Sequence, residues 1–534
     1  MRSLRWRHVR RLFAFVACST SGAGGLSGCM YAEDCNDDRM CLAPPKSPCE
    51  VLEPSVGPVM DECGVFVSAS AGADGPRAGT RLEPFTSLQQ EIVEAQARGL
   101  HHVYACGETF EEEVTLISGV HLWGGRRCDD GGWSYGWPFD GPGHPTTIAP
   151  PAGIPLRVVG NEGAASTIFG VRVVAADASA SDHKSSIAVI LSAGAKVKVV
   201  SSEVQAGDAK DGEAGEDALI ERAKDGVLGN VGADACTANS ATGALPAVTV
   251  CDDGIESIGG YGGDGGIDVG GDGAPGQPEP AANLEDNGFG GTGADVARCG
   301  EGSDGAHGAD AGRAAGAVGA GQLSIHGWVG VRGEDGKKGG VGQGGGGGGG
   351  SKGRGDMVAC RAGRPQGGAA GGSGGSGGCG GRGGKGGGYG GASIGIVALQ
   401  GSALTLETTQ VAAGNGGRGG VGGTGQPGGG GSYGGYGGRP PPGVGDLWPA
   451  CRGGKGGIGG RGGDAGGGLG GPSYGVASVA AYVSFGPDAP LRPGNAGDGG
   501  PAGNASPDDP VGSGAPGLSL PYVQFDAPDP EPPR

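Results

Sequence analysis

Glycine recurs at every third position in several long blocks of this chain, and this period limits what the chain can fold into. The blocks begin near Gly371, Gly416 and Gly453 and follow a Gly-Gly-x pattern. The chain has 131 glycines in 534 residues, more than three times the usual content of about 7%. Aromatic residues make up only 5%, so a conventional apolar core cannot fill a chain of this length. The sequence therefore predicts either a repetitive, backbone-driven structure or disorder over much of its length.

A period of three matches the extended left-handed helix with three residues per turn. Two of its three rows would then carry no side chain, so neighbouring chains can approach closely and exchange backbone hydrogen bonds. The third row, which includes Arg418, Val421 and Thr424, would point outward. Proline is too sparse in these blocks for collagen. Two alternatives stay open: an ordered polyglycine II bundle, or flexible disorder, because glycine loses the most entropy on ordering.

The first 28 residues predict export. Several arginines precede an apolar run at residues 12–17, and small residues then lead to the sequence Leu-Ser-Gly-Cys that ends at Cys29. This arrangement resembles a bacterial lipoprotein signal, in which the Cys becomes the lipidated N-terminus. We therefore expect lipidation at Cys29 and membrane contact through that lipid. Cys18 is a rival anchor, and a plain secretory peptide is the alternative. No later stretch is long and apolar enough to span a membrane.

Export makes disulfides the expected state of most of the 14 cysteines. Four cysteines crowd a Pro-rich segment and predict a small N-terminal knot: Cys35, Cys41, Cys49 and Cys63. Cys106 and Cys128 lie about one solenoid turn apart, which predicts a disulfide between neighbouring turns, with an unpaired state as the alternative. Zinc-type pairs of Cys-x-x-Cys do not occur. We expect no metal and no cofactor.

The chain is acidic, with a formal net charge of −19, so nucleic acid is not an expected partner. The charge is uneven, because residues 29–320 are acidic and residues 321–471 are basic. Three interpretations stay open. The basic part can fold back on the acidic part, it can meet anionic cell-surface polymers, or the charges can simply be solvated.

Residues 64–210 predict a β-rich solenoid behind a short helix. The helix is predicted over residues 87–98, with an N-cap at Thr86 or Ser87 and an end at Gly99. Its predicted apolar face consists of Leu88, Ile92, Val93 and Ala97. Short apolar runs separated by turns then predict strands at residues 102–105, 114–116, 120–123, 156–159 and 168–174.

This order of features resembles the start of right-handed parallel β-helix proteins of the pectin-lyase-like superfamily. The resemblance is carried by the segment Gly79–Phe85, the helix, and the segments Val103–Phe110 and Val120–Gly125. It implies an all-β fold, a right-handed parallel β-helix whose N-terminal helix caps the open end of the stack. It implies little about chemistry.

A unit of 22 residues is repeated within the chain. Residues 186–207 and 393–414 align in their apolar positions, their internal glycines and a final Ala-Gly. Residues 323–333 match the second half of this unit, and residues 473–477 match its start. Glycine-rich stretches follow the ends of the units at residues 207, 333 and 414. We predict that the units are turns of one stack and that the glycine blocks are excursions leaving one edge of it side by side.

Candidate catalytic residues are few. An acid–base cluster of the polysaccharide lyase or hydrolase type is conceivable at Asp177, Asp182, His183 and Lys184. These residues fall in a predicted loop, so an exposed polar turn is the favoured interpretation.

A candidate metal group consists of His101, His102 and His121. It is weak because adjacent residues on a strand face opposite ways. A near match to a calcium-binding nonapeptide at residues 259–267 has its apolar residue displaced by one.

The predicted organisation has six parts. They are a lipoprotein signal at 1–28, a Cys/Pro-rich tether at 29–63, the N-terminal part of the β-helix at 64–210, an acidic Gly-rich excursion at 211–321, Gly-Gly-x excursions alternating with β-helix turns at 322–506, and a Pro-rich tail at 507–534.

Taken whole, the chain resembles the glycine-rich, PGRS-type surface lipoproteins of myxobacteria-like bacteria, although it has no Pro-Glu helical domain of the mycobacterial kind. This resemblance implies a location and no activity. We predict a non-enzymatic protein anchored by lipid to the envelope, at the outer membrane of a Gram-negative bacterium, with an adhesive or structural role. Its expected partners are the membrane and anionic or neutral cell-surface polysaccharide. Two alternatives are a β-helix polysaccharide lyase or hydrolase and an ice-binding polyglycine bundle.

Overall fold

A computed structural model of the chain divides into two units, residues 1–52 and residues 53–534. The structure describes residue 49 and residues 59–73, 78–128, 132–137, 144–161, 163–179, 184–354, 359–444 and 446–526. Apart from residue 49, everything described belongs to the second unit. The predicted lipidation at Cys29 and the predicted disulfide cysteines Cys35 and Cys41 therefore lie outside the described residues.

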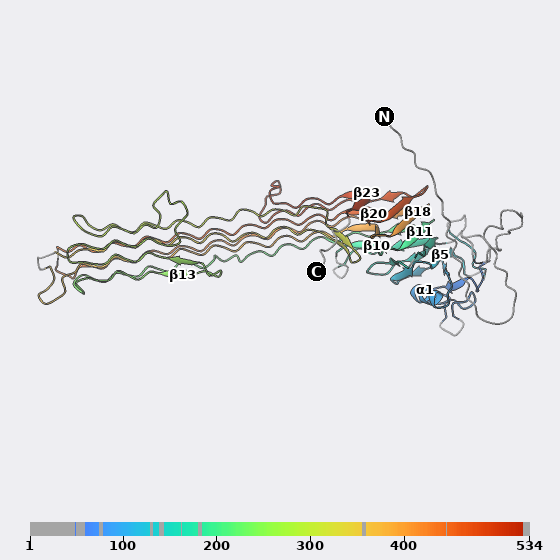
Figure 1. Ribbon diagram of the computed structural model, residues 1–534, viewed down its shortest axis with the longest axis horizontal. Helices are drawn as coiled ribbons and strands as arrows, with labels where there is room; N and C mark the ends of the chain where they lie inside the picture. Colours follow the sequence, from blue (N-terminus) through green and yellow to red (C-terminus); the bar gives the residue numbers. More distant parts are fainter. Residues whose placement is uncertain are drawn as a thin grey trace, which may run out of the picture. The chain divides into compact units, whose positions relative to one another are not determined.

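The second unit is nearly all β and contains three sheets of parallel strands (Figure 1). The first sheet has the order β1 (Gly64–Val67), β2 (His102–Cys106), β5 (His121–Arg126), β8 (Ser166–Phe169), β11 (Lys196–Val200), β18 (Ala403–Glu407) and β21 (Tyr482–Phe485). The second has the order β4 (Val114–Ile117), β7 (Leu156–Val159), β10 (Ser186–Leu191), β17 (Ser393–Ala398), β20 (Ser473–Val479) and β23 (Ser519–Phe525). The third has the order β3 (Thr109–Phe110), β6 (Thr146–Ile148), β9 (Val171–Val174), β12 (Glu203–Gln205), β19 (Gln410–Ala412) and β22 (Leu491–Arg492).

The chain visits these sheets in cyclic order. Strands β10, β11 and β12 each enter a different sheet, and β17, β18 and β19 then lie beside them in the same sequence. Each turn of the chain thus adds one strand to every sheet, and we call this arrangement the three-sheet stack. Inward-facing aliphatic side chains from successive turns fill its interior, as expected for parallel sheets that are buried on one or both faces.

Helix α1 (Leu88–Ala97) covers one end of the stack and begins where the sequence predicts. The Ser87 hydroxyl accepts the backbone N–H of Gln90 at 3.2 Å, which satisfies a free donor of the first turn. The predicted buried face is partly wrong, because Val93 and Ala97 are exposed. The helix instead buries a narrower stripe with i, i+3, i+4 and i+7 spacing: Leu88, Glu91, Ile92 and Ala95.

The predicted repeat of residues 186–207 and 393–414 is confirmed. The two units are neighbouring turns in exact sequence register, with Ser186 opposite Ser393 and Val197 opposite Leu404. A third turn starts at Ser473, which pairs with Ser393 as predicted.

The prediction for residues 323–333 is wrong. They do not join the stack but contribute to an antiparallel hairpin, β15 (Gln322–Ser324) and β16 (Gly327–Val329). Gly327, the first residue of β16, follows the two-residue turn and has a φ of +102°, which glycine adopts readily. Trp328 then packs on the outward side chains of β10, β17 and β20, so these strands are buried on both faces.

Three excursions leave the stack, at residues 207–392, 414–472 and 494–518, and their extended chains run side by side (Figure 1). We call this part the glycine bundle; it also contains a short hairpin of β13 (Val248–Val250) and β14 (Glu256–Ile258). Each excursion is closed at its base by a serine hydroxyl. Ser393 donates to the Gly207 carbonyl, Ser473 to Gly414 and Ser519 to Gly494, each at 2.7 Å. The excursions therefore leave one edge of the stack together.

The chain at residues 371–391 lies inside the glycine bundle and shows why the period is three. Successive N–H groups of Gly374, Gly375 and Ser376 donate to three different chains, at 2.9–3.0 Å. The carbonyls of this chain accept from further chains, as in the 2.9 Å bond from Gly345 to Gly375. Three residues per turn place successive donors about 120° apart, so one chain hydrogen-bonds to neighbours on all sides.

Close packing of these chains requires glycine. A Cβ built on Gly374 would lie 1.8 Å from the carbonyl oxygen of Gly345, and one on Gly377 would lie 2.1 Å from that of Gly342. At the surface the restriction ends, since a Cβ on Gly312 would meet nothing within 4 Å. Interior chains of the bundle therefore need the Gly-Gly-x pattern in order to pack closely.

Candidate functional site

The predicted acid–base cluster is only partly described, because Asp182 and His183 lie outside the described residues. The other two members hold the base of the glycine bundle. The Asp177 carboxylate accepts the backbone N–H of Asp208 at 2.7 Å. Lys184 forms an ion pair with Glu213, which lowers the pKa of that carboxyl, and its ammonium lies 5.0 Å from the ring centre of Tyr389.

The predicted histidine group packs on the first sheet. The rings of His102 and His121 stack at 5.1 Å between neighbouring strands. His121 Nδ1 accepts the N–H of Thr167 at 3.0 Å, and His102 Nδ1 lies 3.3 Å from the Cys63 carbonyl. Burial lowers the pKa of His102 to about 4, so this ring is neutral at neutral pH. Within the described part of the chain, no group of three potential metal ligands comes together.

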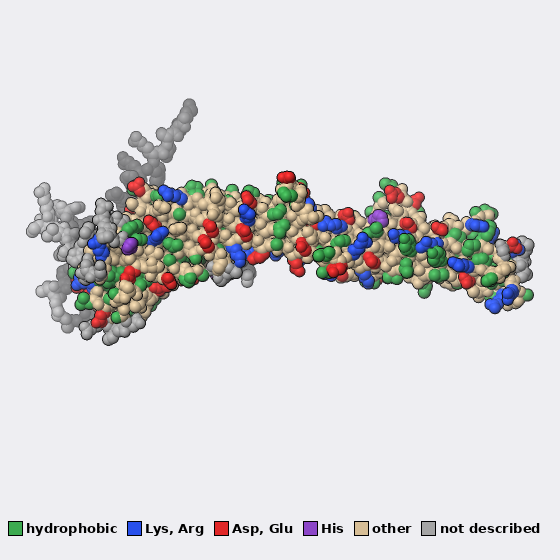
Figure 2. All heavy atoms as spheres, turned by 180° about the vertical axis from the view of Figure 1, so that it is seen from behind, with side chains coloured by type: hydrophobic (Ala, Val, Ile, Leu, Met, Phe, Trp, Pro, Cys, Tyr) green, Lys and Arg blue, Asp and Glu red, His purple; other side chains and the backbone are tan. Residues whose placement is uncertain are grey.

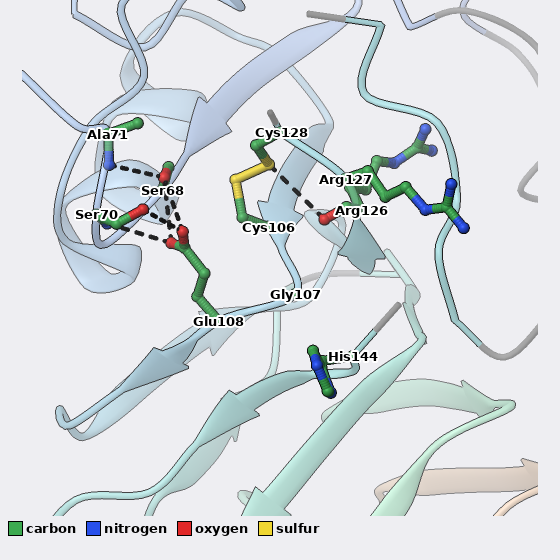
Figure 3. Close-up of a pocket in the computed structure, with 10 residues that line it drawn as sticks. All are labelled: Ser68, Ser70, Ala71, Cys106, Gly107, Glu108, Arg126, Arg127, Cys128 and His144. Atoms are coloured by element: carbon green, nitrogen blue, oxygen red, sulfur yellow. Dashed lines mark hydrogen bonds between the residues drawn. A yellow bond between two sulfur atoms is a disulfide. The ribbon is translucent and has the colours of Figure 1, made fainter. Parts of the chain in front are cut away.

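A cleft of about 400 Å³ opens beside β2 and β5 and is shown in Figure 3. Glu108 is the carboxylate among its lining residues. It accepts hydrogen bonds from the Ser68 hydroxyl at 3.1 Å and the Ser70 backbone N–H at 3.3 Å, and a further one from the Ser70 hydroxyl. These donors occupy the carboxylate and tie the loop at residues 68–71 to the stack.

The basic residues of the cleft face away from Glu108 (Figure 3). The buried Arg126 guanidinium donates to the Trp133 carbonyl at 2.7 Å and lies 3.8 Å from the ring centre of Tyr135. Burial lowers the pKa of Arg126. Acid–base hydrolysis of glycosides uses two carboxyl groups, and the described lining residues supply one, that of Glu108. These contacts of Glu108 and Arg126 join neighbouring segments of the chain at this cleft.

Cys106 and Cys128, the pair predicted from their spacing, are joined by a disulfide that forms one wall of the cleft. Cys49 and Cys63 are also disulfide-bonded. Three further disulfides, whose pairing sequence reasoning did not predict, cross-link the glycine bundle: Cys236–Cys360, Cys251–Cys379 and Cys299–Cys451.

Comparison of the chain with protein-family models, with curated proteins and with solved structures gives no match. The surface of the second unit must therefore be interpreted from its own geometry. Across the residues that the structure describes, no helix has the length and apolar character needed to cross a membrane.

The acidic and basic parts of the chain pack against each other in the glycine bundle, and charges of both signs alternate along the surface (Figure 2). Lys338 pairs with Asp253 at 2.9 Å, and Arg382 pairs with Asp252 at 2.6 Å. These contacts join the acidic region, residues 29–320, to the basic region, residues 321–471. The basic part of the chain therefore folds back on the acidic part, and some of their opposite charges pair.

Aspartates form a regular ladder between two parallel chains, residues 207–235 and 415–439. At each rung, an aspartate Oδ1 accepts the backbone N–H of an outward-row residue on the neighbouring chain, and the residue after the aspartate donates to the carbonyl of that same residue. We call this set the aspartate ladder. Its rungs, at 2.6–2.8 Å, are Asp208–Asn415, Asp211–Arg418, Asp217–Thr424, Asp225–Gly430 and Asp234–Arg439.

The ladder explains the acidic character of residues 207–235. An outer chain of the bundle lacks a neighbour on its exposed side, so the N–H groups of its outward row would otherwise bond only to water. A carboxylate that accepts such a donor forms a charge-assisted hydrogen bond. Sequence reasoning missed the ladder, although its aspartates precede glycine or alanine at intervals of three, or multiples of three, in several places.

Proposed function

We propose that this protein is a lipid-anchored envelope protein of a Gram-negative outer membrane, and that its fold is a right-handed parallel β-helix that carries a polyglycine II rod. The cyclic strand order and the constant register of the turns support the β-helix. Hydrogen bonding with a period of three supports polyglycine II, as does the absence of positive φ among the glycines of residues 207–235.

The observation that carries this proposal is the length and cross-linking of the glycine bundle. Residues 207–235 run as one extended chain, which spans about 90 Å at about 3.1 Å per residue. Backbone hydrogen bonds connect it to its neighbours along this length, and three disulfides cross-link the chains of the bundle. On its outer chains such a rod displays outward-row side chains along its length, as at Arg418, Tyr433 and Tyr436.

This display favours an adhesive or structural role, with cell-surface polysaccharide as the partner. The outward row mixes arginine, valine, threonine and tyrosine, for example at Arg418, Val421, Thr424 and Tyr433. A flat face of small side chains, which would suit ice, is not the arrangement of this row. The membrane is the second partner, through the lipid at Cys29.

Metabolic labelling with a fatty acid tests the anchor. We expect label on the wild-type protein and on Cys18→Ser, and none on Cys29→Ser. An epitope inserted at residues 440–443, in a turn of the glycine bundle, then tests display on intact cells by antibody binding. Equal labelling of the wild type and Cys29→Ser, or an epitope that is reached only after lysis, would contradict the proposal.

A further inference from the structure

The chain pair of the aspartate ladder has rungs without aspartate, and two of them are consecutive and carry tyrosine. Gly229 and Gly232 donate to the carbonyls of Tyr433 and Tyr436 at 2.9 Å, as the ladder geometry requires. The residues before these glycines are Leu228 and Val231, whereas the rung at Val421 has the small Ala214 and the five rungs of the ladder have aspartate. An aliphatic side chain cannot accept the tyrosine N–H, so the ladder is lost at the two rungs that carry tyrosine.

These four residues form an exposed apolar strip. The exposed fractions are 64% for Leu228, 65% for Val231, 58% for Tyr433 and 59% for Tyr436. Because the chain has three residues per turn, the two tyrosines lie in one row about 9 Å apart. We call this set the tyrosine strip. A cluster of four large exposed apolar side chains on two neighbouring chains indicates a contact surface.

Two cations on the next chain border the tyrosine strip. The Arg452 guanidinium carbon lies 5.3 Å from the ring centre of Tyr433 and 4.9 Å from that of Tyr436, and Lys455 Nζ lies 5.2 Å from the ring of Tyr433. Arg452 Nε also donates to the Gly434 carbonyl at 3.2 Å, which holds the side chain in place. Neither cation forms an ion pair with a carboxylate of the described residues.

We propose that the tyrosine strip, with Arg452 and Lys455, binds an anionic polysaccharide. The inference rests on the proposed adhesive function and names its ligand class and its site. Sugar rings have apolar C–H faces that pack on aromatic rings, and the spacing of Tyr433 and Tyr436 suits alternate rings of an extended chain. The two cations would bind carboxylate or sulfate groups of that chain, since arginine matches the geometry of such anions.

The shape of the strip favours a polysaccharide over a folded protein. Four exposed side chains in two rows offer a narrow, elongated contact, whereas stable protein interfaces bury about 800 Å² on each partner. A linear polymer can lie along the row and repeat the same contacts. The backbone N–H groups of Tyr433 and Tyr436, which face Leu228 and Val231 in place of aspartates, would add donors for its hydroxyl or carboxylate oxygens.

Binding of the full-length protein, purified in detergent, to immobilised polygalacturonate tests this proposal, with neutral dextran as the comparison polymer. We expect Tyr433→Ala/Tyr436→Ala to bind polygalacturonate at least tenfold more weakly than the wild type. Arg452→Met/Lys455→Met keeps the aliphatic stems, so we expect it to lose both affinity and the salt dependence of binding. Tyr261→Ala and Tyr482→Ala, which remove exposed tyrosines outside the strip, should bind as the wild type does.

Each variant should show the same midpoint of thermal unfolding as the wild type, which would show that a loss of binding is not a loss of fold. Unchanged binding by the double tyrosine variant overturns the site. Equal binding of dextran and polygalacturonate overturns the anionic ligand, and a wild type that binds neither polymer overturns the inference as a whole. The proposed envelope function is tested separately, by fatty-acid labelling and by antibody access to the glycine bundle.

Discussion

The Asp211 carboxylate oxygen Oδ1 lies 2.6 Å from the backbone nitrogen of Arg418, 207 residues further along the chain. The same offset relates Ser186 to Ser393 within the three-sheet stack. Paired chains in the first part of the glycine bundle therefore keep the sequence offset of 207 residues that relates neighbouring turns of the three-sheet stack. The offset shifts to 205 only between the rungs at Asp217 and Asp225, so two extra residues are accommodated on the first chain between them.

This relationship predicts that ladder aspartates stabilise the rod through their acceptor oxygens. Asp211→Ala should lower the free energy of unfolding by about 0.5–1.5 kcal/mol, and hydrogen exchange at the Arg418 amide should become faster. Asp211→Asn keeps an acceptor oxygen and should lower the free energy of unfolding by less. Chemical denaturation and amide exchange of the three proteins measure this. Equal losses for alanine and asparagine would assign the effect to charge and not to the hydrogen bond.

Sequence periodicity was sufficient to predict the repeated turns of the stack and the excursions that leave it at residues 207 and 414, but it wrongly placed one at residue 333 and did not predict the one at residue 494. The aligned apolar positions of residues 186–207 and 393–414 repeat a full turn, and a repeat of that kind constrains register strongly because one face is buried. The segment at residues 323–333 misled the same reasoning. It shares the apolar pattern of the repeat, but Trp328 and Gly327 favour a hairpin that packs on the outside of the stack.

Interior and surface glycines should differ sharply in their tolerance to alanine. Gly374→Ala places a methyl group against the Gly345 carbonyl, so two backbones must separate, and we expect a loss of about 1–3 kcal/mol or more. Gly312→Ala has open space around the new methyl group and should change stability little. Thermal unfolding of both variants tests this, and a similar midpoint for the two would show that the bundle is not closely packed in solution.

The candidate binding residues were harder to predict than the fold. Tyr433 and Arg452 belong to different glycine blocks, and the sequence contains no signal that pairs these two chains. Their proximity depends on which chains become neighbours in the glycine bundle. The same is true of Cys251 and Cys379, which lie 128 residues apart, so an even cysteine count predicts bonding without its connectivity.

Loss of the Cys251–Cys379 disulfide should destabilise the glycine bundle. A cross-link over a loop of this length restricts the unfolded chain and contributes about 2–4 kcal/mol. We expect Cys251→Ser/Cys379→Ser to unfold at lower denaturant concentration and to be cleaved faster by protease within residues 207–392. Cys106→Ser/Cys128→Ser is the matched control, because its disulfide joins turns of the stack. Equal protease cleavage of the glycine bundle in both double variants would contradict a stabilising role of the Cys251–Cys379 disulfide in that bundle.

The capping helix should make stability depend on pH through Glu91. This side chain is fully buried, and both carboxylate oxygens lack a hydrogen-bond partner. Burial raises the pKa of Glu91 from 4.5 to about 9, an effect that Arg98 only partly offsets. The folded protein therefore holds a proton that the unfolded chain releases above pH 4.5. This contribution to stability is complete below that pH, falls by about 1.4 kcal/mol per pH unit as pH rises, and is lost above pH 9.

Glu91→Gln keeps the shape of the side chain and cannot ionise, so it should remove this slope. We expect the variant to gain stability relative to the wild type as pH rises from 5 to 9, measured by chemical denaturation at each pH. Glu111→Gln changes an exposed carboxylate nearby and should leave the difference flat. A stability difference between Glu91→Gln and the wild type that does not change with pH would mean that Glu91 is ionised in the folded protein.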